Sequence, residues 1–192
     1  MNAPFFRTES QGGYVLLEAL VAMLVFAIGV LGVVSLQAVS AKNAGAAKLR
    51  TDASTLANQL IGRMWASDRT AKTLKDQFQG GPQGSGVTDG AGYTQWLGDV
   101  TKPGTVLGSL PGITVSSPDI RPTVIVTCLP NADCTPPPLP QASTAQVTIV
   151  LRWKIPGEEI KANGDPACQI PGQTEVDWHC FVAVAQMNAV NN

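Results

Sequence analysis

The first third of the chain carries one long run of apolar side chains. Residues 19–36 include no charged residue, and further apolar residues extend the run to residues 14–41. A helix of about 20 residues crosses the hydrocarbon core of a bilayer, so the run is long enough to span a membrane. Gly29 and Gly32 are compatible with this, because glycine is common in membrane helices. The pattern predicts a transmembrane helix.

Beyond this run the pattern becomes that of an amphipathic helix. Apolar residues recur at spacings of three and four, and the charged and amide side chains occupy other faces. If the helix continues from residue 14 to about residue 67, it is roughly 80 Å long at 1.5 Å per residue. Two helices with a bend near Gly45 are the alternative. The predicted apolar face consists of Leu49, Ala53, Leu56, Leu60 and Met64.

A cleavable secretory signal peptide is a competing interpretation of the apolar run. Such a peptide has a basic start, an apolar stretch of about 7–15 residues and a cleavage site with small residues. Here the run is longer and continues without a turn signal into Gln37 and the amphipathic stretch. The pattern therefore favours a helix that is retained, and a plain transmembrane anchor stays open as an interpretation.

A single carboxylate, Glu18, lies just inside the apolar run, behind Gly12 and Gly13. A carboxylate in hydrocarbon costs roughly 2.5–3.5 kcal/mol on insertion scales, so its presence there calls for a partner. A cut after Gly13 would create one, because the new amine on Tyr14 would be largely cationic near neutral pH. That amine could pair with Glu18 of its own helix or of a neighbouring one.

Residues 13–22, Gly-Tyr-Val-Leu-Leu-Glu-Ala-Leu-Val-Ala, resemble the prepilin signature of type IV pilins and type II secretion pseudopilins. In that family a membrane aspartyl peptidase cuts after the glycine and methylates the new amino terminus. The resemblance implies that Gly13 precedes the cut, that Tyr14 becomes the N-methylated first residue, and that Glu18 sets axial register in assembly. Tyr14 departs from the usual phenylalanine, and Glu9 offsets Arg7, the only basic side chain of the leader.

A second resemblance covers about residues 13–70. The segments 29–32, 48–50 and 56–67 are similar to the PilV-type minor pilins, the type IV pilus modification proteins. This implies a minor pilin that promotes pilus assembly or function, with the prepilin peptidase, the major pilin, other minor pilins and the inner-membrane assembly platform as partners. It also implies a bacterial inner-membrane precursor with a cytoplasmic amino terminus and a periplasmic head, later part of the extracellular pilus.

Two other functions stay open at the level of sequence. A minor pseudopilin of a type II secretion system would share the same first third of the chain. A membrane-tethered binding protein or adhesin would keep its amino terminus uncut and bind a surface ligand through exposed loops. The segment 56–67 favours the pilus.

The second part of the chain has the pattern of strands and loops. Residues 80–92 are rich in glycine, serine and glutamine and are expected to form a surface loop, followed by a short helical turn within residues 93–100 that carries Trp96 and Leu97. Alternating side chains predict strands at residues 123–128 and 146–153, with a third candidate at 179–186. Pro136, Pro137, Pro138 and Pro140 are expected to stiffen an exposed loop between the first two strands.

These elements predict an α+β fold of the type IV pilin kind, in which a long amino-terminal helix packs on a small antiparallel sheet. The predicted organisation is a leader at residues 1–13, a transmembrane or filament-core half of the helix at 14–41, an amphipathic half at 42–67 and a globular head at 68–192.

All four cysteines follow the predicted membrane segment, and their even number favours disulfides in an oxidising compartment. Four cysteines allow three connectivities. The simplest joins neighbours in sequence, Cys128 to Cys134 and Cys168 to Cys180. The second of these pairs resembles the disulfide loop that major pilins carry near the carboxy terminus.

No motif points to chemistry or to a bound cofactor. His179 lies beside Cys180, but the chain has no ligand spacing typical of zinc, so no metal site is predicted. No nucleophile elbow, phosphate loop or catalytic histidine arrangement is recognisable, so we expect neither catalytic residues nor a small-molecule substrate. Asp119, Glu158 and Glu159 are isolated carboxylates, expected to be solvated. A net charge of −1 argues against nucleic-acid binding.

Overall fold

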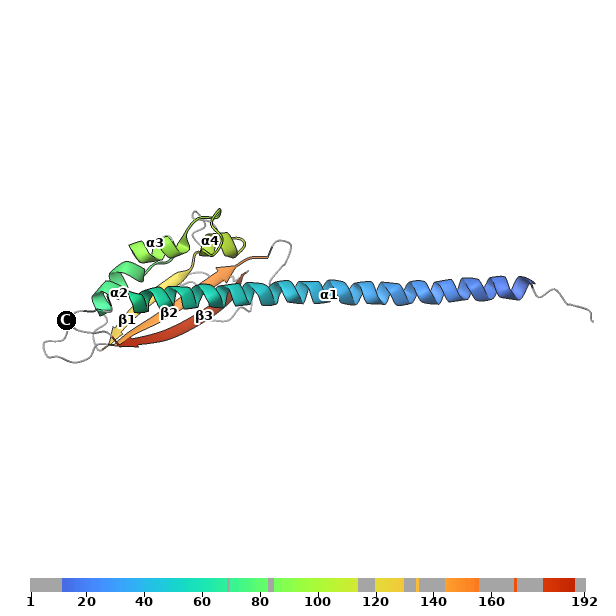
Figure 1. Ribbon diagram of the computed structural model, residues 1–192, viewed down its shortest axis with the longest axis horizontal. Coiled ribbons are helices and arrows are strands. Elements are labelled where there is room, and N and C mark those ends of the chain that lie inside the picture. The colour runs from blue at the N-terminus through green and yellow to red at the C-terminus, as the bar shows by residue number, and fades with distance from the viewer. Residues whose placement is uncertain are drawn as a thin grey trace, which may run out of the picture. The chain divides into compact units, whose positions relative to one another are not determined.

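The computed structural model describes residues 12–68, 70–82, 85–113, 120–129, 134, 144–155, 168 and 178–188. The chain divides into two compact units, Met1–Ala47 and Lys48–Asn192, and we call the second the head unit. The elements are α1 (Gly12–Ala66), α2 (Ala71–Phe78), α3 (Ala91–Leu97), α4 (Val106–Ser109), β1 (Thr123–Leu129), β2 (Thr144–Trp153) and β3 (His179–Asn188) (Figure 1). The predicted α+β fold with a long amino-terminal helix is confirmed.

Helix α1 is a single element of 55 residues and continues through Gly45, where a division into two helices was the alternative. In the head unit its apolar face lies in the core, as the spacing of three and four predicts. Leu49, at the start of this face, is partly buried and packs against the core. The fully buried members of the face are Ala53, Leu56, Ala57, Leu60 and Met64.

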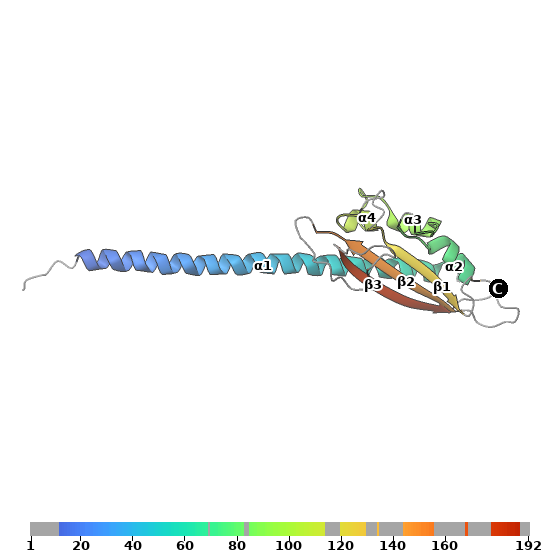
Figure 2. The same ribbon diagram turned by 180° about the vertical axis from the view of Figure 1, so that it is seen from behind.

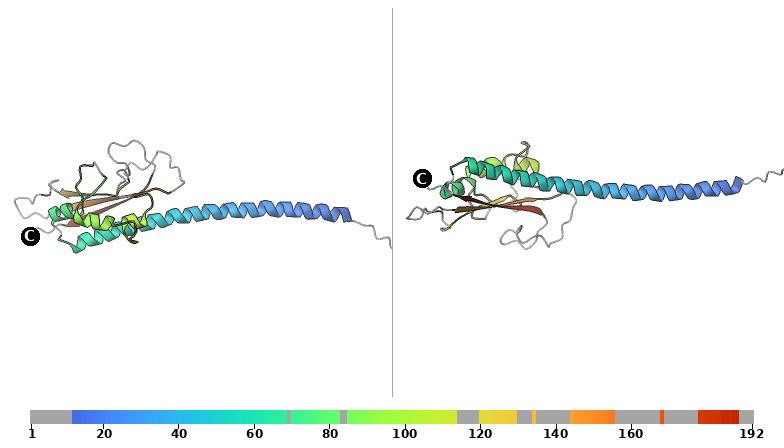
Figure 3. Two further views of the ribbon diagram at one scale, coloured as in Figure 1. Left: turned by 90° about the horizontal axis from the view of Figure 1, so that it is seen from above. Right: turned by 60° about the horizontal axis from the view of Figure 1, so that its bottom comes forward.

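The three strands form one antiparallel sheet in the order β1-β2-β3 (Figure 2). Within the head unit, the second half of α1 and the short helices α2, α3 and α4 lie on the same side of this sheet (Figure 3). Buried side chains alternate with more exposed ones along β1 and along the first half of β2, as expected for a sheet with one covered face, whereas β2 is buried continuously from Ile149 to Trp153. The core side chains of β1 and β2 include Val124, Val126, Val147, Ile149 and Leu151.

Two short helices, α2 and α4, were not expected from the sequence. Helix α2 begins after Thr70, whose side chain caps it by accepting from the Thr73 amide at 3.3 Å. The segment 80–92 was expected to be a surface loop, and Ser85, Gly86 and Thr88 are exposed there. At its start, however, Gly80 is buried and exchanges two backbone hydrogen bonds with Val124, at 3.1 and 2.8 Å. The Tyr93 ring lies so close that a Cβ on Gly80 would come within 2.4 Å of it.

Gly98 ends α3 in a backbone conformation that only glycine adopts readily, with φ 70° and ψ −144°. A Cβ there would also lie 2.3 Å from the Cβ of Thr105, whose hydroxyl caps α4. We therefore expect Gly98→Ala to lower the unfolding free energy of the head by about 2–4 kcal/mol, the combined effect of backbone strain and overpacking. Chemical denaturation of the full chain in detergent micelles measures this loss.

The matched control for this substitution is Gly104→Ala. Gly104 also has a positive φ, 80°, but a Cβ on it would meet nothing within 4 Å. Its substitution is expected to cost only the backbone strain, about 1–2 kcal/mol. Equal losses for the two variants would show that the contact with Thr105 contributes nothing.

Candidate functional site

The residues of the predicted processing site lie in the first turns of α1. The helix begins at Gly12, so Gly13 and Tyr14 are both helical, and residues 1–11 lie outside the described residues. Glu18 follows Tyr14 by four positions, which places both side chains on the same face of the helix. Both are exposed, Tyr14 by 73%. The structure thus brings together two of the residues that sequence analysis singled out.

The start of α1 is weakly helical by composition. Two successive glycines open the helix, and glycine is less favourable than alanine in a helix by about 1 kcal/mol per residue. No acidic side chain lies in the first turn to stabilise it electrostatically. The backbone around Gly13 and Tyr14 can therefore unwind at low cost.

The first unit leaves its apolar side chains exposed. Among the described residues, α1 is the one helix whose length and composition suit it to cross a membrane, and no part of its most apolar stretch is buried within the chain. Monomeric soluble proteins rarely expose a continuous apolar surface of this extent. A surface of this kind suits contact with lipid or with other apolar helices. The most exposed side chains are Tyr14, Leu16, Met23, Phe26, Leu31 and Leu36.

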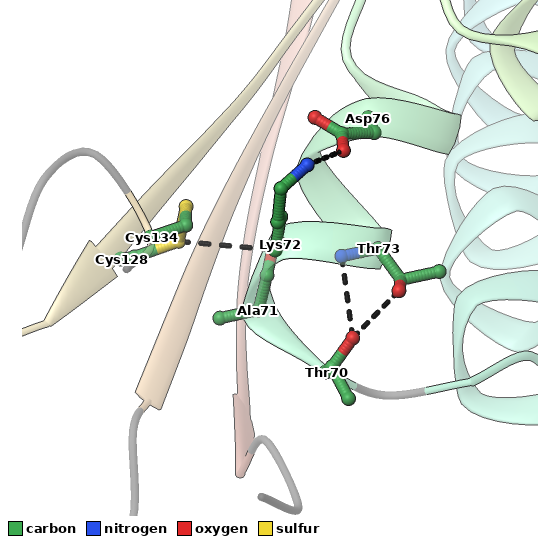
Figure 4. The surroundings of a disulfide bond; sticks show 7 residues. All are labelled: Thr70, Ala71, Lys72, Thr73, Asp76, Cys128 and Cys134. Carbon is green, nitrogen blue, oxygen red and sulfur yellow. Dashed lines mark hydrogen bonds and ion pairs between the residues drawn. A yellow bond between two sulfur atoms is a disulfide. The ribbon is translucent and has the colours of Figure 1, made fainter. Parts of the chain in front are cut away.

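The two disulfides of the head join neighbours in sequence, Cys128 with Cys134 and Cys168 with Cys180. Figure 4 shows that the first lies beside the start of α2, where the Cys128 sulfur is 3.8 Å from the carbonyl oxygen of Ala71. The Cys128–Cys134 bond therefore closes its loop where β1 and α2 meet.

The second disulfide adjoins a buried arginine, Arg152 of β2, which pairs with Cys180 in the sheet. Its Nε donates to the carbonyl of Cys168 at 3.0 Å, and its Nη1 donates to the carbonyl of Arg121 at 3.1 Å and to the Thr123 hydroxyl at 2.7 Å. Burial lowers the pKa of Arg152 to about 10, so the guanidinium stays charged near neutral pH. Its role is to tie Cys168 to the start of β1.

A second buried polar cluster surrounds Tyr93, which burial gives a raised pKa. The Tyr93 hydroxyl donates to the carbonyl of Pro122 at 2.8 Å, and the Arg121 guanidinium lies 5.7 Å from the ring centroid. Arg121 also forms an ion pair with Asp89 at 2.5 Å. The one polar group of the Tyr93 side chain thus holds the segment before β1. This indicates that the cluster stabilises the fold.

No group of three or more metal-ligating side chains occurs in the part of the chain that the structure describes. His179 stacks on the Trp153 ring at a centroid distance of 5.8 Å, in the first position of β3. The carboxylates Asp119, Glu158 and Glu159 and the proline run at 136–140 lie outside the described residues.

No protein-family model, curated protein or solved structure matches the chain. The pilin-like layout therefore stands on the chain's own features, the long apolar helix at the amino terminus and the small antiparallel sheet of the head.

Proposed function

We propose that this protein is a minor pilin of a type IV pilus. The precursor is anchored in the bacterial inner membrane by the apolar half of α1, with its amino terminus in the cytoplasm and its head in the periplasm. The prepilin peptidase cuts after Gly13 and methylates Tyr14. The mature chain then enters the pilus or its initiating tip complex, where it contacts the major pilin and other minor pilins after passing the assembly platform.

The observation that carries this proposal is the place of Glu18. It lies one turn after Tyr14, at the start of a helix whose next 27 positions, from Ala19 to Gly45, are exposed. A plain anchor gains nothing from a carboxylate in this position, because the charge opposes insertion. A subunit that pairs this carboxylate with an amine freed by cleavage gains a specific contact with its neighbour.

The resemblance of segments 29–32, 48–50 and 56–67 to PilV-type proteins supports the pilus over a type II secretion pseudopilin. The two functions share processing and anchoring and differ in the partner subunits. Recovery of the chain in sheared pili would favour a minor pilin. Its absence from pili, together with a secretion defect in cells that lack the chain, would favour a pseudopilin.

The test of the proposal is the mass of the mature amino-terminal peptide, measured in cells with and without the prepilin peptidase. We expect a chain that begins at methylated Tyr14 when the peptidase is present and at Met1 when it is absent. Gly13→Val is expected to block the cut, since a branched side chain replaces the glycine next to the scissile bond. Gly12→Val, one residue earlier, is the control and is expected to be cut.

A chain that begins at Met1 in cells with active peptidase would overturn the proposal. It would leave a plain membrane anchor, as expected for a tethered binding protein. Cleavage at another position, downstream of the apolar run, would instead identify a secretory signal peptide.

A further inference from the structure

The head unit has a pocket of about 720 Å³ where α1, α2 and α3 meet. One side chain of α1, Arg63, faces two glutamines, Gln77 at the end of α2 and Gln95 in α3. Phe78 and the first turn of α3 supply the rest of the lining. Among the described residues that line the pocket, the guanidinium of Arg63 is the one charged group.

Arg63 has an unmet hydrogen-bonding group. The side chain is half-buried, and among the described residues no acceptor contacts its Nη1. This nitrogen has no accessible surface, so the guanidinium must turn toward the pocket that it lines to pair with a ligand. The described carboxylates nearest in sequence to the pocket's lining are engaged elsewhere. Asp76 pairs with Lys72, Asp89 pairs with Arg121, and Asp68 accepts from the amide of Thr70 at 3.1 Å. A buried donor left in this state is costly, and the cost is higher for a charged group.

The walls of this pocket are rigid. Gly90 donates its backbone N–H to the carbonyl of Gln79 at 2.9 Å, which fixes the start of α3 against the end of α2. A Cβ on Gly90 would come within 2.2 Å of the Gln77 carbonyl oxygen, and one on Gly92 within 2.6 Å of the Phe78 ring. Because α2 and α3 are already in close contact here, the walls cannot close over Arg63 without disrupting the core.

We propose that this pocket binds a carboxylate on an acidic side chain of a partner protein. A carboxylate offers two oxygens in the plane that a guanidinium recognises, and such charge-assisted pairs are stronger than neutral hydrogen bonds. The Gln77 and Gln95 amides are exposed, and each can donate an N–H to the same group. The binding site is separate from the processing site on α1, and it does not depend on whether the chain enters a filament.

The test uses the full chain in detergent micelles, with the peptide acetyl-Ala-Glu-Ala-amide as the probe. The side-chain amide signals of Gln77 and Gln95 are followed by nuclear magnetic resonance as the peptide is added. We expect saturable shifts of both signals. The peptide with glutamine in place of glutamate is expected to bind at least about tenfold more weakly, because it lacks the charge.

Arg63→Gln is expected to weaken binding of the glutamate peptide by about tenfold or more. Arg50→Gln removes the same charge from an exposed position on the same helix and is expected to leave binding unchanged within about twofold. Arg63→Lys keeps the charge but loses the two-pronged geometry, and we expect it to restore only part of the affinity. The unfolding temperature of Arg63→Gln should equal or exceed that of the unchanged chain, since a poorly satisfied buried group is removed.

Three results would overturn the proposal. If Arg50→Gln and Arg63→Gln weakened binding of the glutamate peptide equally, the peptide would be attracted by positive charge spread over the surface and not by this pocket. Competition by inorganic phosphate as strong as that of the glutamate peptide would mean a general oxyanion site, as for a lipid headgroup. Unchanged peptide binding together with a lowered unfolding temperature in Arg63→Gln would mean that the guanidinium serves only the fold.

Discussion

Replacing Trp96 with alanine is expected to lower the unfolding free energy of the head by about 3–5 kcal/mol, the usual cost of removing a large aromatic side chain from a core. The side chain is fully buried, and its Nε1 donates to the carbonyl of Leu56 on α1 at 2.9 Å. It also contacts the Tyr93 ring at a centroid distance of 6.0 Å. Trp96 therefore joins α3 to the buried face of α1 and to the tyrosine cluster.

Chemical denaturation of the full chain in micelles, followed by near-ultraviolet circular dichroism with the disulfides intact, measures this loss. Trp96→Phe keeps an aromatic ring but loses the donor to Leu56, so its loss should be smaller, about 1–3 kcal/mol. Trp65→Ala is the control, because this tryptophan of α1 is 45% exposed. A loss at Trp65 equal to that at Trp96 would contradict the place we give α3 in the core.

The elements predicted correctly are those in which the spacing of apolar residues marks the buried face. The spacing of three and four from Leu49 to Met64 identified the face of α1 that lies in the core. Alternation in residues 123–128 identified the buried side of β1, with Val124, Val126 and Cys128 inward. Each pattern arises because one face of the element is buried. It is visible in the sequence even when the segment that covers this face is not known.

The missed features depend on partners distant in sequence. Arg152 follows the alternation of an outward position, yet it is buried, because groups 16 to 31 residues away supply its hydrogen bonds. Gly80 is in a segment with loop composition, but its two hydrogen bonds to Val124 fix it beside β1. Both cases show a long-range contact that overrides the local pattern.

The sequence contains a weaker signal for the short helix α2. Thr70 is a good capping residue, and the buried side chains Ala71, Leu74 and Phe78 are spaced as on one helical face. Eight residues are too few to form a helix without tertiary packing, so this signal alone does not outweigh the glycine-rich sequence after it. The Arg63 pocket could not be predicted either, because three helices contribute to it.

The proposed processing site, in contrast, is local in sequence, since Gly13, Tyr14 and Glu18 lie within two turns of one helix. What the sequence lacks is the partner for Glu18. In the described part of the chain no contact to this carboxylate is present, and the side chain is exposed with the rest of the apolar half. The proposed assembly role places this partner on another subunit.

Glu18→Gln is accordingly expected to lower incorporation of the mature chain into pili by at least about 100-fold. Loss of one member of an ion pair in apolar surroundings costs about 3–5 kcal/mol, because the remaining charge, here a Tyr14 amine, is left unpaired. At about 1.4 kcal/mol for each factor of ten, the lower limit corresponds to a factor of about 100. Quantitative mass spectrometry of sheared pili and of membranes from the same cells gives the ratio to compare.

The membrane fraction distinguishes assembly from anchoring in this experiment. Glutamine is neutral, so insertion of the variant should be as efficient as before or better, and its amount in the membrane should not fall. Asp52→Asn, which removes a carboxylate from the head half of the same helix, is the control and is expected to be incorporated normally. Normal incorporation of Glu18→Gln would show that its carboxylate pairs with nothing in the filament, whereas a fall in the membrane fraction would place its role in insertion instead.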